Sequence, residues 1–193
     1  MSWRYEIRLA GSGGQGVIMA GMILAETLAR DPNRWVVMSQ AYTPQQRGGP
    51  SSAEIIVSDE EIDYPKGLNL DLLVTLDDEG LTRNYKVLRS GGLAIAETGC
   101  IAEMAQKGIV CREIDFLKIS SKTTGSTVNA NIVALGAIAG ALQIADKKIL
   151  FDAIISHLPK EKSNEYLLAL EEGYQEGLKI KDQKSKTKEE GVK

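Results

Sequence analysis

A glycine-rich turn between an expected strand and an expected helix limits the fold of this chain more than any other feature. Residues Gly11–Gly16 read Gly-Ser-Gly-Gly-Gln-Gly, follow the alternating strand pattern of Tyr5–Ala10, and lead into a helical pattern over Gln15–Arg30. Glycine permits positive φ and close approach of a ligand, and a helix N-terminus offers unpaired N–H groups to an anion. The segment therefore predicts a phosphate-binding turn in which Ser12 and Gln15 add side-chain donors. The alternative is a tight turn that only packs the helix against the sheet.

The turn also has the G-x-G-x-x-G spacing of dinucleotide-binding folds. Those folds carry an acidic residue about 20 residues further on, at the end of the second strand, where it binds the ribose hydroxyls. Here the second expected strand, Trp35–Ser39, is followed by Gln40, and the next carboxylate along the chain is Glu54. The sequence therefore disfavours NAD as the ligand.

Strand and helix patterns alternate along much of the chain, which predicts an α/β fold. We expect three layers: a Rossmann-like, open, mostly parallel sheet with helices on both faces. Leu70–Leu76 is nearly continuous in apolar residues, as in a central strand buried on both faces. The other expected strands are Ala53–Ser58, Gly92–Ala96 and Gly108–Cys111, and the other expected helices are Asp78–Leu88, Asn129–Leu142, Asp146–His157 and Ser163–Ile180.

The length of 193 residues predicts one domain, over residues 1–180. Residues 181–193 are rich in lysine and glutamate and have little apolar surface to bury, so we expect a disordered, charged tail there.

Composition excludes several classes of ligand and location. The net charge of −3 gives no basic excess for nucleic acid, and no apolar run approaches the roughly 18 residues of a membrane span. Without a signal-peptide pattern, a cytoplasmic location is expected. Two cysteines, Cys100 and Cys111, and one histidine, His157, are too few for a clustered metal site or a histidine-dependent triad. We therefore expect no metal ligands and no catalytic residues in this chain.

A second polar loop, Gln40–Ser52, is expected to share a crevice with the glycine-rich turn, because ligands in open parallel sheets bind beyond the carboxyl ends of the strands. Its one charged residue is Arg47, and a guanidinium can bind phosphate or carboxylate with two parallel N–H bonds. Arg47 could equally be a surface residue or pair with a neighbouring subunit. In the segment Thr123–Asn131, one polar residue is explained as a helix cap, and Asn129 or Asn131 would need a structural or ligand partner if buried.

Four segments together resemble the gamma subunit of the 2-oxoacid:ferredoxin oxidoreductases. They are Gly11–Val17, Arg47–Glu54, Ser58–Pro65 and Asn131–Gly136, and the resemblance extends from about Tyr5 to Leu142. The form of the turn and the Ile62–Pro65 segment are more similar to the 2-oxoglutarate branch. The pyruvate/ketoisovalerate and indolepyruvate branches remain alternatives, and the latter shares the Gly-Gly-Gln-Gly and Arg-Gly-Gly sequences.

The resemblance implies an enzyme complex that decarboxylates a 2-oxoacid oxidatively on thiamine diphosphate, passes electrons through iron–sulfur clusters to ferredoxin and releases an acyl-coenzyme A. Thiamine diphosphate, Mg and the iron–sulfur clusters would lie on partner subunits, and this chain would contact coenzyme A. The implied partners are alpha and beta subunits, with a ferredoxin-like delta subunit in some arrangements, and ferredoxin itself through the complex. Self-association of the isolated chain is left open, and no activity is expected from it.

Carried over position by position, the resemblance marks eight residues for coenzyme A contact. They are Ser12, Gly13, Gly14, Gln15, Gly16, Gln46, Arg47 and Asn131. Relatives with a coenzyme A role often have a lysine near Gln46, and here only Arg47 supplies that charge. Two further interpretations stay open: a non-catalytic scaffold subunit of the same complex, and a free-standing NAD-binding oxidoreductase.

Overall fold

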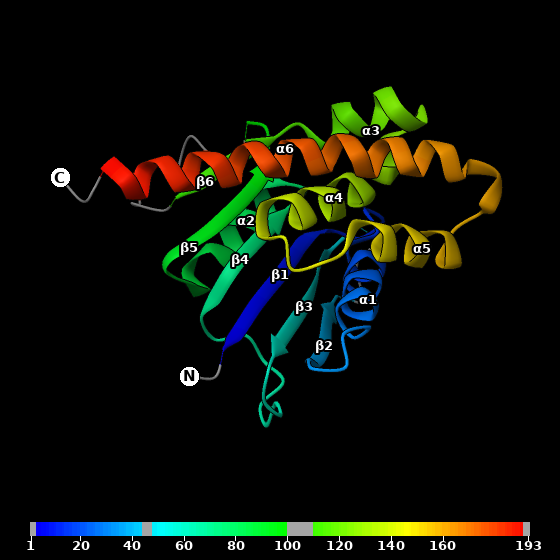
Figure 1. Ribbon diagram of the computed structural model, residues 1–193. Helices are drawn as coiled ribbons and strands as arrows, with labels where there is room; N and C mark the ends of the chain where they lie inside the picture. Colours follow the sequence, from blue (N-terminus) through cyan, green and yellow to red (C-terminus); the bar gives the residue numbers. More distant parts are fainter. Residues whose placement is uncertain (1–2, 44–47, 100–109, 191–193) are drawn as a thin grey trace. The chain divides into compact units, whose positions relative to one another are not determined.

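Six strands form one sheet in a computed structural model of the chain, which describes residues 3–43, 48–99 and 110–190, with side chains as far as Lys181 (Figure 1). The strand order is β2-β3-β1-β4-β5-β6. The strands β1, β4, β5 and β6 run parallel to one another, whereas β3 is antiparallel to both β1 and β2. The strands are β1 (Arg4–Ser12), β2 (Trp35–Tyr42), β3 (Pro50–Ser58), β4 (Leu70–Thr75), β5 (Leu88–Glu97) and β6 (Cys111–Ile114). The expected α/β fold with a mostly parallel sheet is confirmed.

The placement of β3 between β1 and β2 is the main departure from a simple alternation of strands and helices. After α1 (Val17–Leu28), the chain runs along the sheet edge as β2 and returns through a hairpin as β3, which pairs with the whole of β1 from Arg4 to Ser12. This hairpin places the loop after β2 at the same end of the sheet as the glycine-rich turn, because Gly11 pairs with Ser51.

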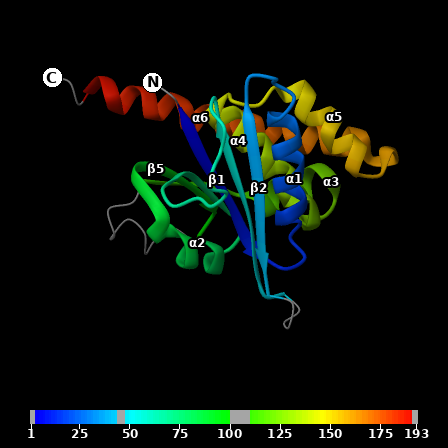
Figure 2. The same cartoon turned by 90° about the horizontal axis from the view of Figure 1, so that it is seen from below.

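Two helices of this part of the chain cover opposite faces of the sheet (Figure 2). Gly21 of α1 packs against Ala53, which pairs with Leu9 of β1. The next residue of β1, Ala10, points the other way and packs with Leu81 of α2 (Asp78–Asn84). Successive side chains of a strand alternate between faces, so α1 and α2 lie on different sides. A 3₁₀ turn over Tyr85–Val87 then leads into β5.

The helices after the sheet form a second compact unit, Phe116–Lys193, distinct from Met1–Asp115. Its helices are α3 (Phe116–Thr124), α4 (Ala130–Leu142), α5 (Lys147–His157) and α6 (Ser163–Glu190), with 3₁₀ turns at Thr127–Asn129 and Lys160–Lys162. Asp146, the first residue of the helix expected over Asp146–His157, caps α5, because its carboxylate accepts from the N–H groups of Lys148 at 2.8 Å and Ile149 at 3.0 Å. The sequence analysis assigned no separate helix to α3.

Glycines set the closest approach within this second unit, between α4 and α6 (Figure 1). A Cβ at Gly136 would collide with the carbonyl oxygen of Leu170, and one at Gly140 with that of Tyr174. From the other helix, a Cβ at Gly173 would collide with the carbonyl oxygen of Val133, and one at Gly177 with that of Ala137. The two backbones therefore touch directly at a crossing that side chains would prevent.

The expected limits of the domain, at residues 1–180, and of a charged tail, at residues 181–193, stay predictions. The backbone of α6 is helical as far as Glu190. Lysine, glutamate and glutamine are good helix formers and can extend an existing helix without burying apolar surface.

Candidate functional site

The glycine-rich turn leaves its helix without a side-chain cap. The turn connects the end of β1 at Ser12 to the start of α1 at Val17, and Gly14 has φ 99° and Gly16 φ 69°, values that L side chains rarely adopt. Gly16 occupies the N-cap position, no side chain accepts a hydrogen bond there, and the first turn of α1 has no acidic residue. Gly14 is exposed, and among the described residues its N–H donates no hydrogen bond, so the turn presents the main-chain N–H of Gly14 to solvent.

The side chains of Ser12 and Gln15 point into the protein rather than outward. Gln15 Oε1 accepts from the Ser12 N–H at 2.7 Å, and Gln15 Nε2 donates to the carbonyl oxygen of Leu76 at 3.3 Å. The Ser12 hydroxyl donates to the carboxylate of Asp77 at 2.6 Å. Both side chains thus hold the turn against the end of β4, and their expected role as ligand donors stays a prediction.

The end of the second loop, at Gly48 and Gly49, lies beside the glycine-rich turn, as expected if the two share a crevice. The Gly13 N–H donates to the carbonyl oxygen of Gly49 at 2.8 Å, and a Cβ at Gly13 would lie 3.4 Å from the main chain of Gly48. The contact is made by described residues at the end of the loop. Gln46 and Arg47, which the sequence analysis singled out, lie outside the described residues.

The asparagines before α4 belong to the second unit. Asn131 is buried in the first turn of α4, with 2% of its surface exposed. Asn129 Nδ2 donates to the Thr124 hydroxyl at 3.0 Å, while the Ser126 hydroxyl accepts from the N–H of Val128 at 3.2 Å. Asn129 and Ser126 therefore have local structural partners, and a ligand role of Asn131 remains a prediction.

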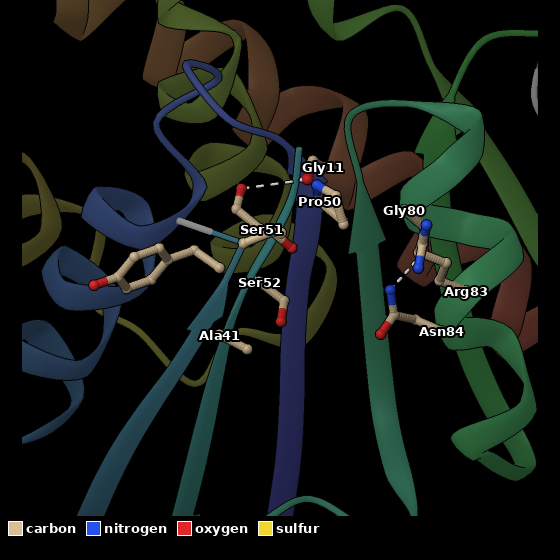
Figure 3. Close-up of a pocket in the computed structure, with 10 residues that line it drawn as sticks. Gly11, Ala41, Pro50, Ser51, Ser52, Gly80, Arg83 and Asn84 are labelled. Carbon is tan, nitrogen blue, oxygen red and sulfur yellow. Dashed lines mark hydrogen bonds between the residues drawn. The ribbon is translucent and has the colours of Figure 1, made fainter. Parts of the chain in front are cut away.

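A pocket of about 200 Å³ opens next to the turn, between α2 and the ends of β1, β2 and β3 (Figure 3). Its lining residues are Gly11, Ala41, Tyr42, Thr43, Pro50, Ser51, Ser52, Gly80, Arg83 and Asn84. The hydroxyl of Ser51 donates to the carbonyl oxygen of Gly11 at 3.2 Å, as the dashed line in Figure 3 shows. Arg83, the cation of this lining, pairs with Glu79 at 2.7 Å. The pocket therefore does not offer a phosphate an unpaired charge from Arg83.

A half-buried ion pair lies on the same face of the sheet. Arg8 of β1 pairs with Glu54 of β3, and its Nη1 donates to Asn84 Oδ1 at 3.0 Å. The hydroxyl of Ser39 lies 3.4 Å from the other oxygen of Glu54. No sequence pattern indicated a functional role for Arg8, Asp77, Arg83 or Asn84. The one signal that could have indicated Asp77 is its position directly after the continuously apolar strand.

Cys111, the cysteine in the part of the chain that the structure describes, is not poised as a nucleophile. Burial raises the pKa of the Cys111 thiol to about 11, so at neutral pH it stays protonated and is a poor nucleophile. Among the described residues, no three His, Cys, Asp or Glu side chains are grouped closely enough to hold a metal ion. Over the same part of the chain, none of the helices has the length and apolar character needed to cross a membrane.

Comparison with known proteins decides the family. The model of the family described as pyruvate ferredoxin/flavodoxin oxidoreductase matches residues 6–176. The chain belongs to this family. The 2-oxoglutarate synthase subunit KorC of Methanocaldococcus jannaschii is 36% identical over 174 residues, which cover 89% of this chain and 93% of the relative.

Solved structures agree with this assignment. The gamma subunit of keto/oxoacid ferredoxin oxidoreductase from Geobacter sulfurreducens is 29% identical, with a TM-score of 0.78 over 92% of this chain and 98% of that one. A 2-oxoglutarate:ferredoxin oxidoreductase from Magnetococcus marinus, with 2-oxoglutarate, coenzyme A and succinyl-CoA bound, has the same fold in 31% of its chain, at 22% identity and a TM-score of 0.76. The chain is therefore a gamma subunit of a 2-oxoacid:ferredoxin oxidoreductase, which favours the subunit interpretation over a free-standing NAD-binding enzyme.

Proposed function

We propose that this gamma subunit binds a phosphate group of coenzyme A through the main-chain N–H groups of Gly14 and the first turn of α1. The complex to which it belongs would decarboxylate 2-oxoglutarate oxidatively, form succinyl-coenzyme A and reduce ferredoxin. The observation that carries the proposal is the uncapped start of α1 behind an exposed, positive-φ glycine. An anion at a helix N-terminus gains about 0.3–1 kcal/mol, and up to about 2 kcal/mol in favourable, partly buried geometry.

The role proposed for this chain is to hold and orient coenzyme A, without taking part in the chemical reaction. Holding one reactant in the right geometry can lower a barrier by several kcal/mol without any acid or base. Thiamine diphosphate with its Mg, and the iron–sulfur clusters, would be bound by alpha and beta subunits and by a ferredoxin-like delta subunit where one exists. These cofactors would carry the decarboxylation and electron transfer.

The choice of 2-oxoglutarate rests on relatives rather than on a substrate pocket in this chain. The 2-oxoglutarate synthase subunit of M. jannaschii supports it, as does a second one from Methanothermobacter thermautotrophicus at 34% identity. A ketoisovalerate oxidoreductase subunit of Methanothermobacter marburgensis matches over a shorter part, 131 residues. Comparing the specificity constants of the purified complex for 2-oxoglutarate, pyruvate and 2-oxoisovalerate decides between these substrates.

A matched pair of glycine substitutions tests coenzyme A binding. Gly14 and Gly99 have almost the same φ, 99° and 98°, and a Cβ at either would meet no atom within 4 Å. Both alanine variants should lose about 1 kcal/mol of stability through backbone strain. In the assembled complex, only Gly14→Ala should raise the Michaelis constant for coenzyme A, by about tenfold, because its methyl group occupies the ligand's approach. Equal Michaelis constants in the two variants would contradict the proposal.

The second loop is tested by Arg47→Ala in the same assay. If Arg47 binds a phosphate with a charge-assisted hydrogen bond, its loss should raise the Michaelis constant for coenzyme A by roughly tenfold to a hundredfold. The Michaelis constant for 2-oxoglutarate should stay nearly unchanged, because that substrate would bind to other subunits. An equal rise in both constants indicates that the loop supports assembly.

A scaffold subunit is the second candidate, and one observation favours it. Ser12 and Gln15 use their side chains inside the protein, and Gly13 uses its N–H on Gly49, so much of the turn serves packing. A scaffold predicts that Gly14→Ala and Arg47→Ala lower the yield of assembled complex. In that case, the Michaelis constants for coenzyme A and for 2-oxoglutarate in the complex that does form would change equally or not at all.

A further inference from the structure

One carboxylate joins the glycine-rich turn to the start of the next helix. Asp77 follows β4 and is the N-cap residue of α2, where its Oδ1 accepts from the Gly80 N–H at 2.7 Å. Its Oδ2 accepts from the Ser12 hydroxyl at 2.6 Å, across 65 positions of the chain. Hydrogen bonds to a charged group are shorter and about twice as strong as neutral ones. Asp77 therefore holds the turn after β1 and the turn after β4 in a fixed relation.

Two glycines make room for this connection. A Cβ at Gly80 would lie 3.0 Å from Asp77 Oδ1 and 3.1 Å from the N atom of Gly11, so the absence of a side chain lets α2 sit against the end of β1. A Cβ at Gly11 would collide with Gln15 Oε1, which accepts from Ser12. A side chain at Gly11 would displace Gln15 from its bond to Ser12, and one at Gly80 would require a small shift of α2.

The clamp formed by Ser12, Gln15 and Asp77 decides which groups of the turn remain available. The Ser12 hydroxyl donates its hydrogen bond to Asp77, and the N–H groups of Ser12, Gly13 and Gln15 donate to other atoms of this chain. Gly14 is exposed, and among the described residues its N–H has no acceptor. Because Ser12 is the last residue of β1 before the glycines, the Ser12–Asp77 bond sets the direction in which the Gly14 N–H points.

We infer that Asp77 is a positioning residue for coenzyme A binding, acting through Ser12; this inference rests on the proposed function. A carboxylate suits the position because its two oxygens each accept a hydrogen bond, whereas asparagine has one oxygen, so Ser12 would keep at most a neutral hydrogen bond in place of the charge-assisted one. When the clamp is broken, the turn spends only part of its time in the binding conformation, and the apparent affinity for coenzyme A falls by that fraction.

A double-substitution cycle in the assembled complex tests the inference. Ser12→Ala and Asp77→Asn should each raise the Michaelis constant for coenzyme A by about tenfold, leaving the turnover number and the Michaelis constant for 2-oxoglutarate unchanged. The double variant should be no worse than either single one, because both remove the same bond. The Asp77→Asn variant keeps a side-chain oxygen that can cap α2 through the Gly80 N–H, so the helix is retained.

Two further variants separate positioning from a general loss of charge or structure. Asp78→Asn removes the same charge one residue later, at an exposed position in the first turn of α2, and should leave the Michaelis constant for coenzyme A as it is. Ser12→Thr keeps a hydroxyl and should restore most of the affinity lost in Ser12→Ala. Should Asp77→Asn fail to fold, an unchanged Michaelis constant for coenzyme A in Ser12→Ala still overturns the inference.

The outcomes are distinguishable from failure of the proposed function. If Gly14→Ala weakens coenzyme A binding but Ser12→Ala and Asp77→Asn do not, the turn binds the cofactor and the positioning role of Asp77 is wrong. Additive effects of the two substitutions, or a parallel rise in the Michaelis constant for 2-oxoglutarate, also overturn it. If Gly14→Ala has no effect either, both the proposed function and the inference fall.

Discussion

Gly14 and Gly136 both leave main chain uncovered, but they expose it to different neighbours. A Cβ at Gly14 would find no atom within 4 Å, whereas one at Gly136 would collide with the backbone of α6. Gly14 has a positive φ that other residues resist, and Gly136 lies within the regular helix α4. In the turn, glycine opens the backbone to a ligand; in the helix pair, it lets two backbones touch.

The difference teaches that glycine content alone does not indicate a binding site. In α4 and α6, glycines four residues apart on each helix, at 136 and 140 and at 173 and 177, form one continuous packing surface. Their conformation is helical, so their cost is the low helix propensity of glycine, roughly 1 kcal/mol each relative to alanine. The close contact of the two helices must offset that cost.

The largest effect is expected where a methyl group would force the helices apart. Gly136→Ala and Gly177→Ala should each destabilise the chain by roughly 3 kcal/mol, because the atoms in the way are backbone and cannot rotate aside. Denaturant unfolding followed by circular dichroism measures the loss. Glu172→Ala, on the exposed side of α6, is the control and should change stability by less than about 0.5 kcal/mol.

Combining the two substitutions sharpens the comparison. Once one methyl group has separated the helices, the second has less to displace, so the double variant should lose less than the sum of the single losses. Full additivity of the two losses would mean that each added methyl group is accommodated locally, without a change in the distance between α4 and α6.

A smaller effect is expected at Gly80, a packing glycine that lies beside the turn. Its Cβ would be 3.1 Å from the main chain of Ala10 and Gly11, a tight contact that a small shift of α2 can relieve. Gly80→Ala should therefore cost about 1–2 kcal/mol. The same unfolding measurement checks this prediction. A loss as large as that of Gly136→Ala would mean that the contact at Gly80 is as unyielding as the backbone contact between α4 and α6.

Local rules explain what could be predicted from the sequence. The turn at Gly11–Gly16, the helix after it and the Asp146 cap depend on residues within a few positions of one another, and all three are present in the structure. The apolar run of β4 likewise indicated a strand buried on both faces. The mostly parallel α/β sheet followed from the alternation of these elements.

Long-range contacts explain what could not be predicted. The position of β3 between β1 and β2 is a matter of strand pairing, which the alternation of Ala53–Ser58 does not specify. The hydrogen bond from Ser12 to Asp77 joins residues 65 positions apart, which the local pattern around the turn cannot reveal. The sequence therefore predicted Ser12 as a donor to a ligand rather than to Asp77. Likewise, Gly136 and Gly173 were expected in helices, but which faces meet depends on how those helices pack.

The smallest effect is expected at Gly13, which tests whether every glycine of the turn is required by conformation. Gly13 has no positive φ, and its Cβ would make an ordinary contact, at 3.4 Å, with Gly48 and Gly49. Gly13→Ala should therefore leave stability within about 0.5 kcal/mol of the parent chain, or raise it slightly by restricting the unfolded chain. If unfolding shows a loss as large as that of Gly14→Ala, the packing of the second loop on the turn is tighter than these distances indicate. A neutral result would assign the conformational demand to Gly14 and Gly16, the two positive-φ residues at the start of α1.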